Sequence, residues 1–347
     1  MGAVSLARRP TVRVGGMTTM RYRLLGPTGL RVSELFLGAM TYQEFSPEVR
    51  RVFELYAEAG GNVVDTASMY GGSEDVVGEL LQGRRDRFVL ATKYTGSRDR
   101  TDPNAAGNHR KNLTLSLEQS LRRLRTDYID LYWVHVWDRH TPVEETMRAL
   151  DDAVRAGKVL YAGISDAPAW VVSRANTLAE WRGWTPFAGL QVPYNLLRRD
   201  VERELLPMAR AFGMSVAAWG VLAHGVLSGR YAEPGAAASR VSPDSISGRD
   251  RAGVRVVIEV AGELGVTPAQ VAIAWALRRG VHPILGTSSA EQLKDNLGAL
   301  EVELPEEVMR RLESAVDFEL GFPGDFIAEA DRSPALYGDA LPRLTGR

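Results

Sequence analysis

Residues 129–165 decide the fold, with the sequence IDLYWVHVWDRHTPVEETMRALDDAVRAGKVLYAGIS. An apolar run over 129–135 is followed by a helical pattern over 142–156 and by a second apolar run over 159–165. Two short apolar runs separated by one amphipathic helix are typical of parallel strands that are buried on both faces. Pro142 suits the first turn of this helix, because that turn needs no partner for its N–H groups. The stretch is therefore predicted to be one strand–helix–strand unit.

The same alternation continues in both directions along the chain. Apolar runs with Gly, Pro, Asn or Asp between them predict further strands over residues 34–38, 62–65, 88–92, 189–191, 215–219 and 283–286. Amphipathic stretches predict further helices over residues 47–59, 74–81, 111–125, 168–181, 201–212 and 305–315. Eight strand–helix units without a break favour a closed (β/α)8 barrel, the TIM barrel, over a doubly wound sheet, for which roughly five or six strands suffice.

The rest of the chain adds a hairpin, a long loop and two tails to this α/β barrel. Residues 1–19 are predicted to be a flexible N-terminal tail, and residues 20–316 a single domain that begins with a hairpin around 26–29. Residues 220–251, after the seventh strand, lack clear periodicity, as is typical of a lid or binding loop. Residues 317–347 are rich in Gly, Pro and Asp, and we expect them to form a C-terminal tail that either closes over the active site or is partly disordered.

The composition excludes several classes of protein. The 347 residues include no cysteine, which rules out disulfides, thiolate catalysis and cysteine-ligated zinc or iron–sulfur sites. The net charge is −1 and no long basic run is present, so neither nucleic acid nor a membrane surface is an expected partner. No run approaches the roughly 18–20 apolar residues of a membrane span, and no apolar stretch follows Arg8 and Arg9 as it would in an export signal. We therefore expect a cytoplasmic location.

Common nucleotide-binding and catalytic motifs are missing. The sequence has no GxGxxG between a strand and a helix, no GxxxxGK[ST], no HExxH and no GxSxG. A Rossmann fingerprint, a P-loop, a zinc peptidase and an α/β-hydrolase are therefore not supported. Four histidines, His109, His140, His224 and His282, lack the spacing of metal ligands, so no metal site is predicted.

Ionisable side chains stand at the ends of three expected strands, where the active site of a barrel lies. Asp65 ends the second strand and Tyr70 follows it in the loop, while Lys93 and His135 end the third and fourth strands. An ammonium at Lys93 would lower the pKa of the Tyr70 phenol, and Asp65 would keep Lys93 charged. His135 could polarise the same substrate oxygen. This set is suited to protonating an oxygen while a carbonyl is reduced.

Five motifs in order, DTASMY, TK, LYWVH, RAGKVLYAGIS and GTSSAEQLKDNLGAL, make the chain resemble the aldo-keto reductases over about residues 22–300. The resemblance implies a (β/α)8 barrel that binds NADPH without a Rossmann domain. It also implies that Asp65, Tyr70, Lys93 and His135 form a catalytic tetrad with Tyr70 as the general acid. The stretches RYRLLGPTGLRVSELFLG and WGVLAHGVLSGRY are most similar to the bacterial and potassium-channel β-subunit branch.

The resemblance implies a nicotinamide end of the cofactor site at the ends of the first, fifth, sixth and seventh strands. Ser165 and Gln191 would bind the carboxamide, and Trp219 would stack on the ring. The residues after the first strand would line the ribose: Gly38, Ala39 and Met40. The backbone N–H groups that follow Trp219 would bind the pyrophosphate: Gly220, Val221, Leu222 and Gly225.

The same resemblance implies a phosphate-binding end. Arg230 and Arg240, in the long loop, would hold phosphate through their guanidinium groups. The last strand and helix would receive the adenosine 2′-phosphate with Gly286, Ser288, Gln292 and Asn296. NADPH is the expected cofactor. Because a hydroxyl at position 288 holds a dianionic phosphate less firmly than a basic side chain does, tolerance of NADH is also expected.

Aromatic side chains, Tyr42, Tyr94 and Trp137, are expected to line the substrate pocket, although packing under a loop is an equal alternative for Tyr42 and Trp137. Such a wall favours an aldehyde, quinone or ketone as the small-molecule partner, and stacking also suits a keto-sugar. The sequence thus predicts NADPH-dependent reduction of a carbonyl to an alcohol. Two alternatives are an NADPH-binding regulatory subunit with little turnover and an isomerase or aldolase that uses Lys93 as a Schiff-base amine.

Overall fold

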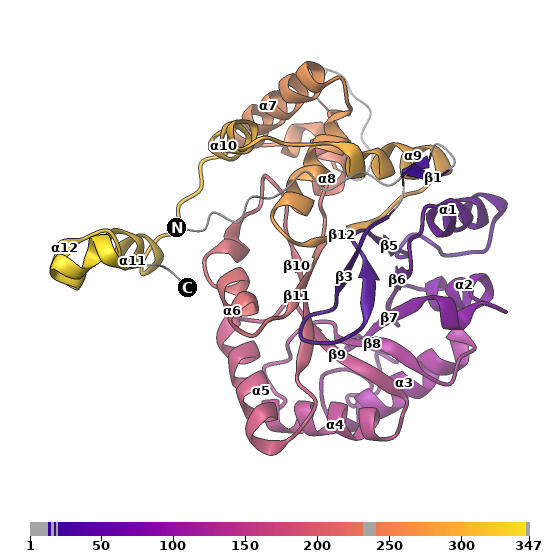
Figure 1. Ribbon diagram of the computed structural model, residues 1–347. Helices are drawn as coiled ribbons and strands as arrows, with labels where there is room; N and C mark the ends of the chain where they lie inside the picture. Colours follow the sequence, from indigo (N-terminus) through magenta and orange to yellow (C-terminus); the bar gives the residue numbers. More distant parts are fainter. Residues whose placement is uncertain (1–12, 15–16, 19, 232–240, 345–347) are drawn as a thin grey trace.

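The computed structural model describes residues 13–14, 17–18, 20–231 and 241–344, and it confirms the (β/α)8 barrel. The strands form one closed sheet of parallel pairs in the order β10-β11-β12-β5-β6-β7-β8-β9, with helices outside it (Figure 1). Their bounds are β5 Phe36–Gly38, β6 Val63–Asp65, β7 Val89–Tyr94, β8 Ile129–Val134, β9 Val159–Ser165, β10 Phe187–Pro193, β11 Ser215–Trp219 and β12 His282–Leu285. Each lies within a few residues of the range that the apolar pattern predicts.

Helices follow the strands along the chain and cover the outside of the barrel (Figure 1). Their bounds are α1 Pro47–Glu58, α2 Ser73–Leu80, α3 Arg110–Leu124, α4 Val143–Arg155, α5 Ala169–Arg182, α6 Leu205–Ala211, α7 Gly248–Leu264, α8 Pro268–Arg278, α9 Ala290–Leu297 and α10 Glu306–Ser314. The helix expected over 201–212 is shorter, because a separate 3-10 turn occupies Asp200–Glu202 and Pro207 suits the first turn of α6. No single helix of the described residues is long and apolar enough to span a membrane; α7 and α8 pass that test only together, across a 98° bend.

The hairpin β3 Tyr22–Leu24 and β4 Arg31–Ser33 closes one end of the barrel. Leu25 in its turn is buried with Trp133 and the other side chains that fill the barrel interior at this end. Gly26 has φ +53°, and a Cβ there would lie 2.2 Å from the carbonyl oxygen of Ala188, so only glycine fits this approach. The amide N–H of Gly26 donates to Ser215 Oγ at 2.7 Å, which ties the hairpin to β11.

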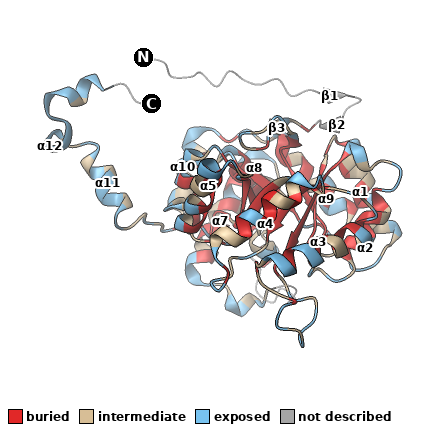
Figure 2. Cartoon of the chain, turned by 90° about the horizontal axis from the view of Figure 1, so that it is seen from below, coloured by how far each residue is buried: buried red, intermediate tan, exposed pale blue. Residues whose placement is uncertain are grey.

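Trp133 fills the middle of the barrel. Its indole lies against Gly163 and Gly189 of the next two strands, where a Cβ would stand 2.3 Å and 2.9 Å from ring atoms. A second, larger core cluster lies between the strands and the helices, as the buried residues in Figure 2 show. The side chains packed around Trp133 fill one half of the barrel interior. The other half, where the strands terminate, contains a cavity.

The chain after α10 differs from the expected tail. In the described part, 317–344, two short helices, α11 Gly324–Ala330 and α12 Pro334–Tyr337, project away from the barrel (Figures 1 and 2). None of the described tail residues lines the cavity at the strand ends. Neither helix has a buried residue, and Phe322 is 87% exposed. Too little apolar surface is removed from water to hold this segment on the barrel.

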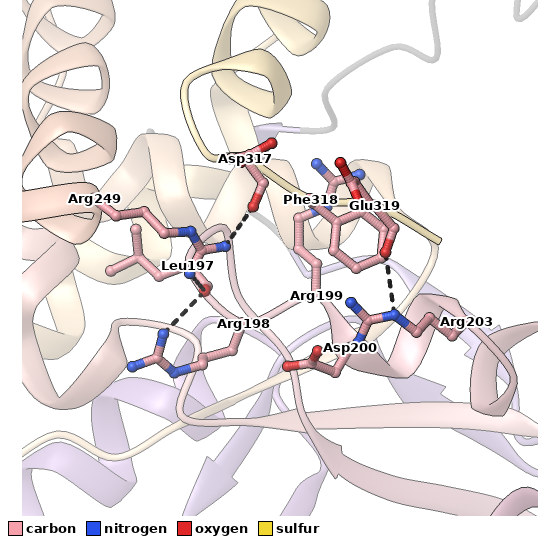
Figure 3. A pocket seen from close by; sticks show the side chains of 9 residues that line it. All are labelled: Leu197, Arg198, Arg199, Asp200, Arg203, Arg249, Asp317, Phe318 and Glu319. Atoms are coloured by element: carbon pink, nitrogen blue, oxygen red, sulfur yellow. Dashed lines mark hydrogen bonds and ion pairs between the residues drawn. The ribbon is translucent and has the colours of Figure 1, made fainter. Parts of the chain in front are cut away.

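The first residues of the tail are nevertheless held firmly by an arginine clamp, defined as Arg199, Arg203 and Arg249. Figure 3 shows the small pocket, of about 310 Å³, in which they meet the tail. Arg249 Nη2 donates to the carbonyl of Asp317 at 2.8 Å, and Arg203 Nε donates to that of Glu319 at 3.1 Å. The guanidinium carbons of Arg199 and Arg203 lie 4.7 Å and 5.1 Å from the ring centre of Phe318.

A buried histidine next to the hairpin makes stability depend on pH. His282 is 2% exposed, stacks on Phe36 and donates from Nδ1 to the carbonyl of Ser33 at 3.2 Å. Burial, and then the charge of Arg23, lower its pKa from 6.5 to about 4. The unfolded chain therefore binds the proton first, so the stability is complete above pH 6.5 and is lost as the pH falls toward 4.

We expect the His282 contribution to the free energy of unfolding to fall by about 3 kcal/mol between pH 7.5 and pH 4. Urea unfolding at several pH values should show that the free energy of unfolding falls less steeply with decreasing pH in His282→Gln than in wild type. His140 is exposed, so His140→Gln should keep the wild-type pH dependence. Equal slopes for wild type and His282→Gln would contradict the assignment.

Candidate active site

A cavity of about 680 Å³ opens at the carboxyl ends of the strands. Register pairs such as Gly38 with Asp65 and Lys93 with Trp133 bring these ends to one rim. Most of the predicted site residues line the cavity: Gly38, Met40, Asp65, Tyr70, His135, Ser165, Gln191, Trp219, Gly220, Val221, Leu222, Gly225, Arg230, Gly286, Ser288, Gln292 and Asn296. The spacing of motifs along the chain therefore translates into one continuous site.

A buried ion pair lies beneath this cavity. Lys93 on β7 is fully buried, and its Nζ donates to Asp65 Oδ2 at 2.5 Å and to the carbonyl of Thr66 at 2.7 Å. Asp65 also accepts from Gln191 Nε2 at 3.0 Å. The two bonds hold both carboxylate oxygens of Asp65, so the ammonium of Lys93 has a fixed place behind the cavity wall.

Tyr70 lies above this ion pair. Lys93 Nζ is 4.9 Å from the centre of the phenol ring, and the ring of His135 meets it edge-on at a centroid distance of 5.6 Å. Burial raises the pKa of Tyr70 above 10, and the charge of Lys93 only partly opposes this effect. The charge of Lys93 thus lowers the pKa of Tyr70 as predicted, but burial outweighs this effect, so the net shift is upward. Tyr70 is a neutral phenol at physiological pH and keeps its proton.

His135 presents a neutral ring to the same space. Burial, and then the charge of Lys93, lower its pKa from 6.5 to about 3. Its Nδ1 is buried and has no hydrogen-bond partner among the described residues. A neutral imidazole has one N–H donor and one acceptor nitrogen. His135 is therefore equipped to bind a polar group that enters the cavity.

The opposite end of the cavity lies around α9. Ser288 donates from both its N–H and its hydroxyl to Gln292 Oε1, at 3.1 Å and 3.0 Å. Thr287 Oγ1 is buried without a hydrogen-bond partner among the described residues, and Arg230 adds a positive charge. Arg240, predicted to act with Arg230, lies outside the described residues. This end combines hydroxyls and a cation, which suits a phosphate group.

Three predictions need correction. Tyr94 and Tyr42 are 0% and 2% exposed and belong to the core, so neither lines the cavity. Successive side chains of a strand point to opposite faces, so Tyr94 must face the helices once Lys93 faces the barrel interior. Ala39 is also fully buried and does not line the cavity; its N–H donates to the carbonyl of Asp65 at 2.8 Å, and its carbonyl accepts from Ser73 Oγ at 2.7 Å.

Trp137 is not among the residues that line the cavity. Its ring packs edge-on against Trp170 at a centroid distance of 5.5 Å, so the alternative reading as packing describes it better. The cavity instead has contributors that were not predicted: Thr41, Met69, Asp166, His224, Ser228, Ala269, Ile284, Leu285 and Asp295. Asp166 directly follows the end of β9, so the search for ionisable strand-end residues could have found it. Met69 carried no signal beyond its position next to Tyr70.

A sequence model of the aldo/keto reductase family matches residues 34–317, which span the whole barrel. The chain belongs to the aldo/keto reductase family. It is 40% identical to a norsolorinic acid reductase of Emericella nidulans over 89% of this chain and 85% of that protein. It is 39% identical to an aryl-alcohol dehydrogenase of Pestalotiopsis microspora, over 88% of this chain and 85% of that one. An aldo-keto reductase of Aspergillus calidoustus is 38% identical over 93% of this chain and 88% of that protein.

This aldo/keto reductase is therefore an oxidoreductase, as its relatives are. The relatives named above are fungal enzymes, so they lend no support to the expected nearness to the bacterial and potassium-channel β-subunit branch. Among the residues that the structure describes, no group of three His, Asp or Glu side chains is arranged to hold a metal ion.

Proposed function

We propose that this aldo/keto reductase reduces an aldehyde or ketone to an alcohol with a nicotinamide cofactor, NADPH by preference, and that Tyr70 supplies the proton. One observation carries the proposal. The phenol of Tyr70 stands between the buried Lys93–Asp65 pair and the neutral ring of His135, at the floor of a cavity that continues to a phosphate-suited end.

The residues along the cavity fit a dinucleotide. Gly220 and Gly225 have φ of +66° and +96°, and no heavy atom lies within 4 Å of a Cβ built on Gly220 or Gly286. These glycines leave backbone N–H groups and open space where a pyrophosphate can approach closely. The Arg230 guanidinium continues this lining. The fit supports a cofactor bound in extended form along one side of the barrel rim.

The chemistry divides between the cofactor and the protein. A bound reduced nicotinamide supplies a hydride to the carbonyl carbon. Tyr70 donates its proton to the carbonyl oxygen, so that one C–H and one O–H bond form and an alcohol results. Lys93 stabilises the phenolate left behind, because its ammonium lies next to the ring. His135 donates a hydrogen bond that orients the oxygen, and Asp65 and Gln191 keep Lys93 in place.

Aromatic carbonyl compounds are the proposed substrates. Met40 and Met69 line the cavity and are 51% and 58% exposed, so the mouth of the site offers two flexible thioether side chains. Thioethers adapt to flat rings and make favourable contacts with them. The names of the aryl-alcohol dehydrogenase and norsolorinic acid reductase relatives support the same class. The burial of Lys93 in its ion pair disfavours a Schiff-base mechanism, and no observation favours a keto-sugar or a regulatory role.

The preference for NADPH rests on Arg230. Its guanidinium is the cation that lines the described cavity, whereas Ser288 and Gln292 satisfy one another. A single cation, with the Asp295 carboxylate lining the same end, is expected to hold the 2′-phosphate with moderate strength, so NADH should also be used. Arg230→Ala should weaken the binding of NADPH more than the binding of NADH.

The test is consumption of NADPH, and separately of NADH, with aromatic aldehydes, a quinone and a keto-sugar as acceptors. We expect turnover of the aromatic aldehydes with both cofactors and a lower KM for NADPH. Formation of the alcohol should match oxidation of the reduced nicotinamide mole for mole. Tight cofactor binding without turnover of any carbonyl would contradict the proposal and favour a regulatory subunit.

A further inference from the structure

Asp166 follows the last residue of β9 and lines the cavity beside Ser165 and Trp219. Its φ of 46° lies in the left-handed region, which aspartate adopts more readily than most residues. Its N–H donates to the carbonyl of Gln191 at 3.3 Å, and its own carbonyl accepts from the N–H of Trp137 at 3.4 Å. The backbone therefore fixes the place from which the carboxylate projects.

The carboxylate of Asp166 forms no direct ion pair with a cation among the described residues. Trp219 Nε1 donates to its Oδ1 at 3.3 Å, but none of the Lys, Arg and His side chains in the described part of the chain forms an ion pair with it. Asp65, in contrast, is paired directly with Lys93. Burial raises the pKa of Asp166 from 3.8, and the bond from Trp219 opposes this effect. The charge of Lys93 also opposes it, but from a distance, so the site holds one carboxylate in a direct ion pair and one without such a pair.

The two redox forms of a nicotinamide cofactor differ in charge at only one place. The ring carries a positive charge when oxidised and none when reduced, while the phosphates are the same in both forms. Only charges near the ring can therefore discriminate between the forms. Under the proposed function the nicotinamide ring lies against Trp219. The Asp166 carboxylate accepts a hydrogen bond from the edge of that indole, at Nε1. An indole that donates to a carboxylate also offers its face to a cation.

We infer that the Asp166 carboxylate makes the site favour the oxidised cofactor over the reduced one, and so shifts the balance of the reaction on the enzyme toward hydride transfer from the reduced cofactor to the carbonyl. This inference rests on the proposed function, because it needs a nicotinamide at Trp219. Asp166 is then a residue that sets the redox balance of the bound cofactor, distinct from Tyr70, which transfers the proton.

The test measures the dissociation constants of NADP⁺ and NADPH by titration calorimetry at pH 8 in wild type and in Asp166→Asn. The asparagine keeps the shape of the side chain and an oxygen that accepts from Trp219, and it removes only the charge. The ratio of the NADP⁺ constant to the NADPH constant should rise about tenfold, or about 1.4 kcal/mol. For this two-electron couple that ratio corresponds to a shift of about 30 mV in the potential of the bound cofactor.

Asp295→Asn is the matched control. Asp295 also lines the cavity, and it accepts hydrogen bonds from Thr267 and Gln270 at the α9 end. Its charge acts on parts of the cofactor that do not change on reduction. The two dissociation constants should therefore change by the same factor, and their ratio should stay as in wild type.

The outcomes separate the two hypotheses. Failure of wild type to bind either cofactor would overturn the proposed function and this inference with it. Binding of both forms with a ratio that Asp166→Asn leaves unchanged would overturn this inference alone. Asp166→Ala, which also lacks the Trp219 bond, should show the same rise in the ratio if Asp166→Asn does not fold. A rise of equal size in Asp295→Asn would also overturn the inference.

Discussion

Replacing Tyr70 by phenylalanine is expected to lower kcat for carbonyl reduction by roughly 10²–10⁴-fold, the usual contribution of a general acid. The phenol is the proposed proton donor, next to the ion pair of Lys93 and Asp65, and the raised pKa keeps it protonated at neutral pH. Steady-state kinetics with an aromatic aldehyde and NADPH measure the loss. Affinity for NADPH should change by no more than about twofold, because the variant removes one atom from the reacting end of the site only.

Tyr42→Phe provides the matched control for this experiment. It removes the same hydroxyl group from a tyrosine that is buried in the core, and the hydroxyl of Tyr42 has no hydrogen-bond partner among the described residues. Turnover of Tyr42→Phe should equal that of wild type. Full turnover of Tyr70→Phe would rule out Tyr70 as the proton donor.

Replacing Lys93 by methionine is expected to reduce both stability and activity. The change leaves the Asp65 carboxylate buried with only the amide of Gln191 as a donor, and breaking one side of a buried ion pair costs about 3–5 kcal/mol. Urea unfolding measures this loss. Turnover should fall as well, because the phenolate of Tyr70 loses the neighbouring ammonium.

Two comparisons isolate the cause. Lys158 pairs with Glu118 where both side chains are substantially exposed, so Lys158→Met should cost less than about 1 kcal/mol. The double variant Asp65→Asn with Lys93→Met removes both buried charges and should recover much of the stability without recovering turnover. A Lys93→Met protein as stable as wild type would show that the pair is not buried in solution.

The barrel could be predicted because its strands are short apolar runs and its helices are amphipathic, and both patterns are local. The strand ends at Asp65, Lys93 and His135 then followed from the rule that such a barrel places its chemistry at one rim. The error at Tyr94 was avoidable, since alternation along β7 excludes the cavity for the neighbour of Lys93. Whether a loop aromatic such as Tyr42 or Trp137 packs or binds depends on distant contacts, which no local pattern contains.

Electrostatic properties were the least predictable part of the site. The sequence places Lys93 near Tyr70 but does not reveal how strongly both are buried, and burial decides the direction of the pKa shift. The C-terminal tail is a second case in which the sequence does not reveal burial. Its composition suggests a cover for the active site, but Phe322 and Phe326 are exposed, and α11 lies away from the barrel (Figure 2).

The arginine clamp also defines where the barrel can be connected to something else. Its contacts end at Glu319, and every described helix beyond that residue lies outside the barrel core. A second protein joined after Glu319 would therefore start from an anchored point on the surface, with the cofactor cavity left open. A natural insertion or an engineered fusion at this junction has a rigid attachment on one side and an unconstrained chain on the other, which is the geometry that suits a tethered partner enzyme.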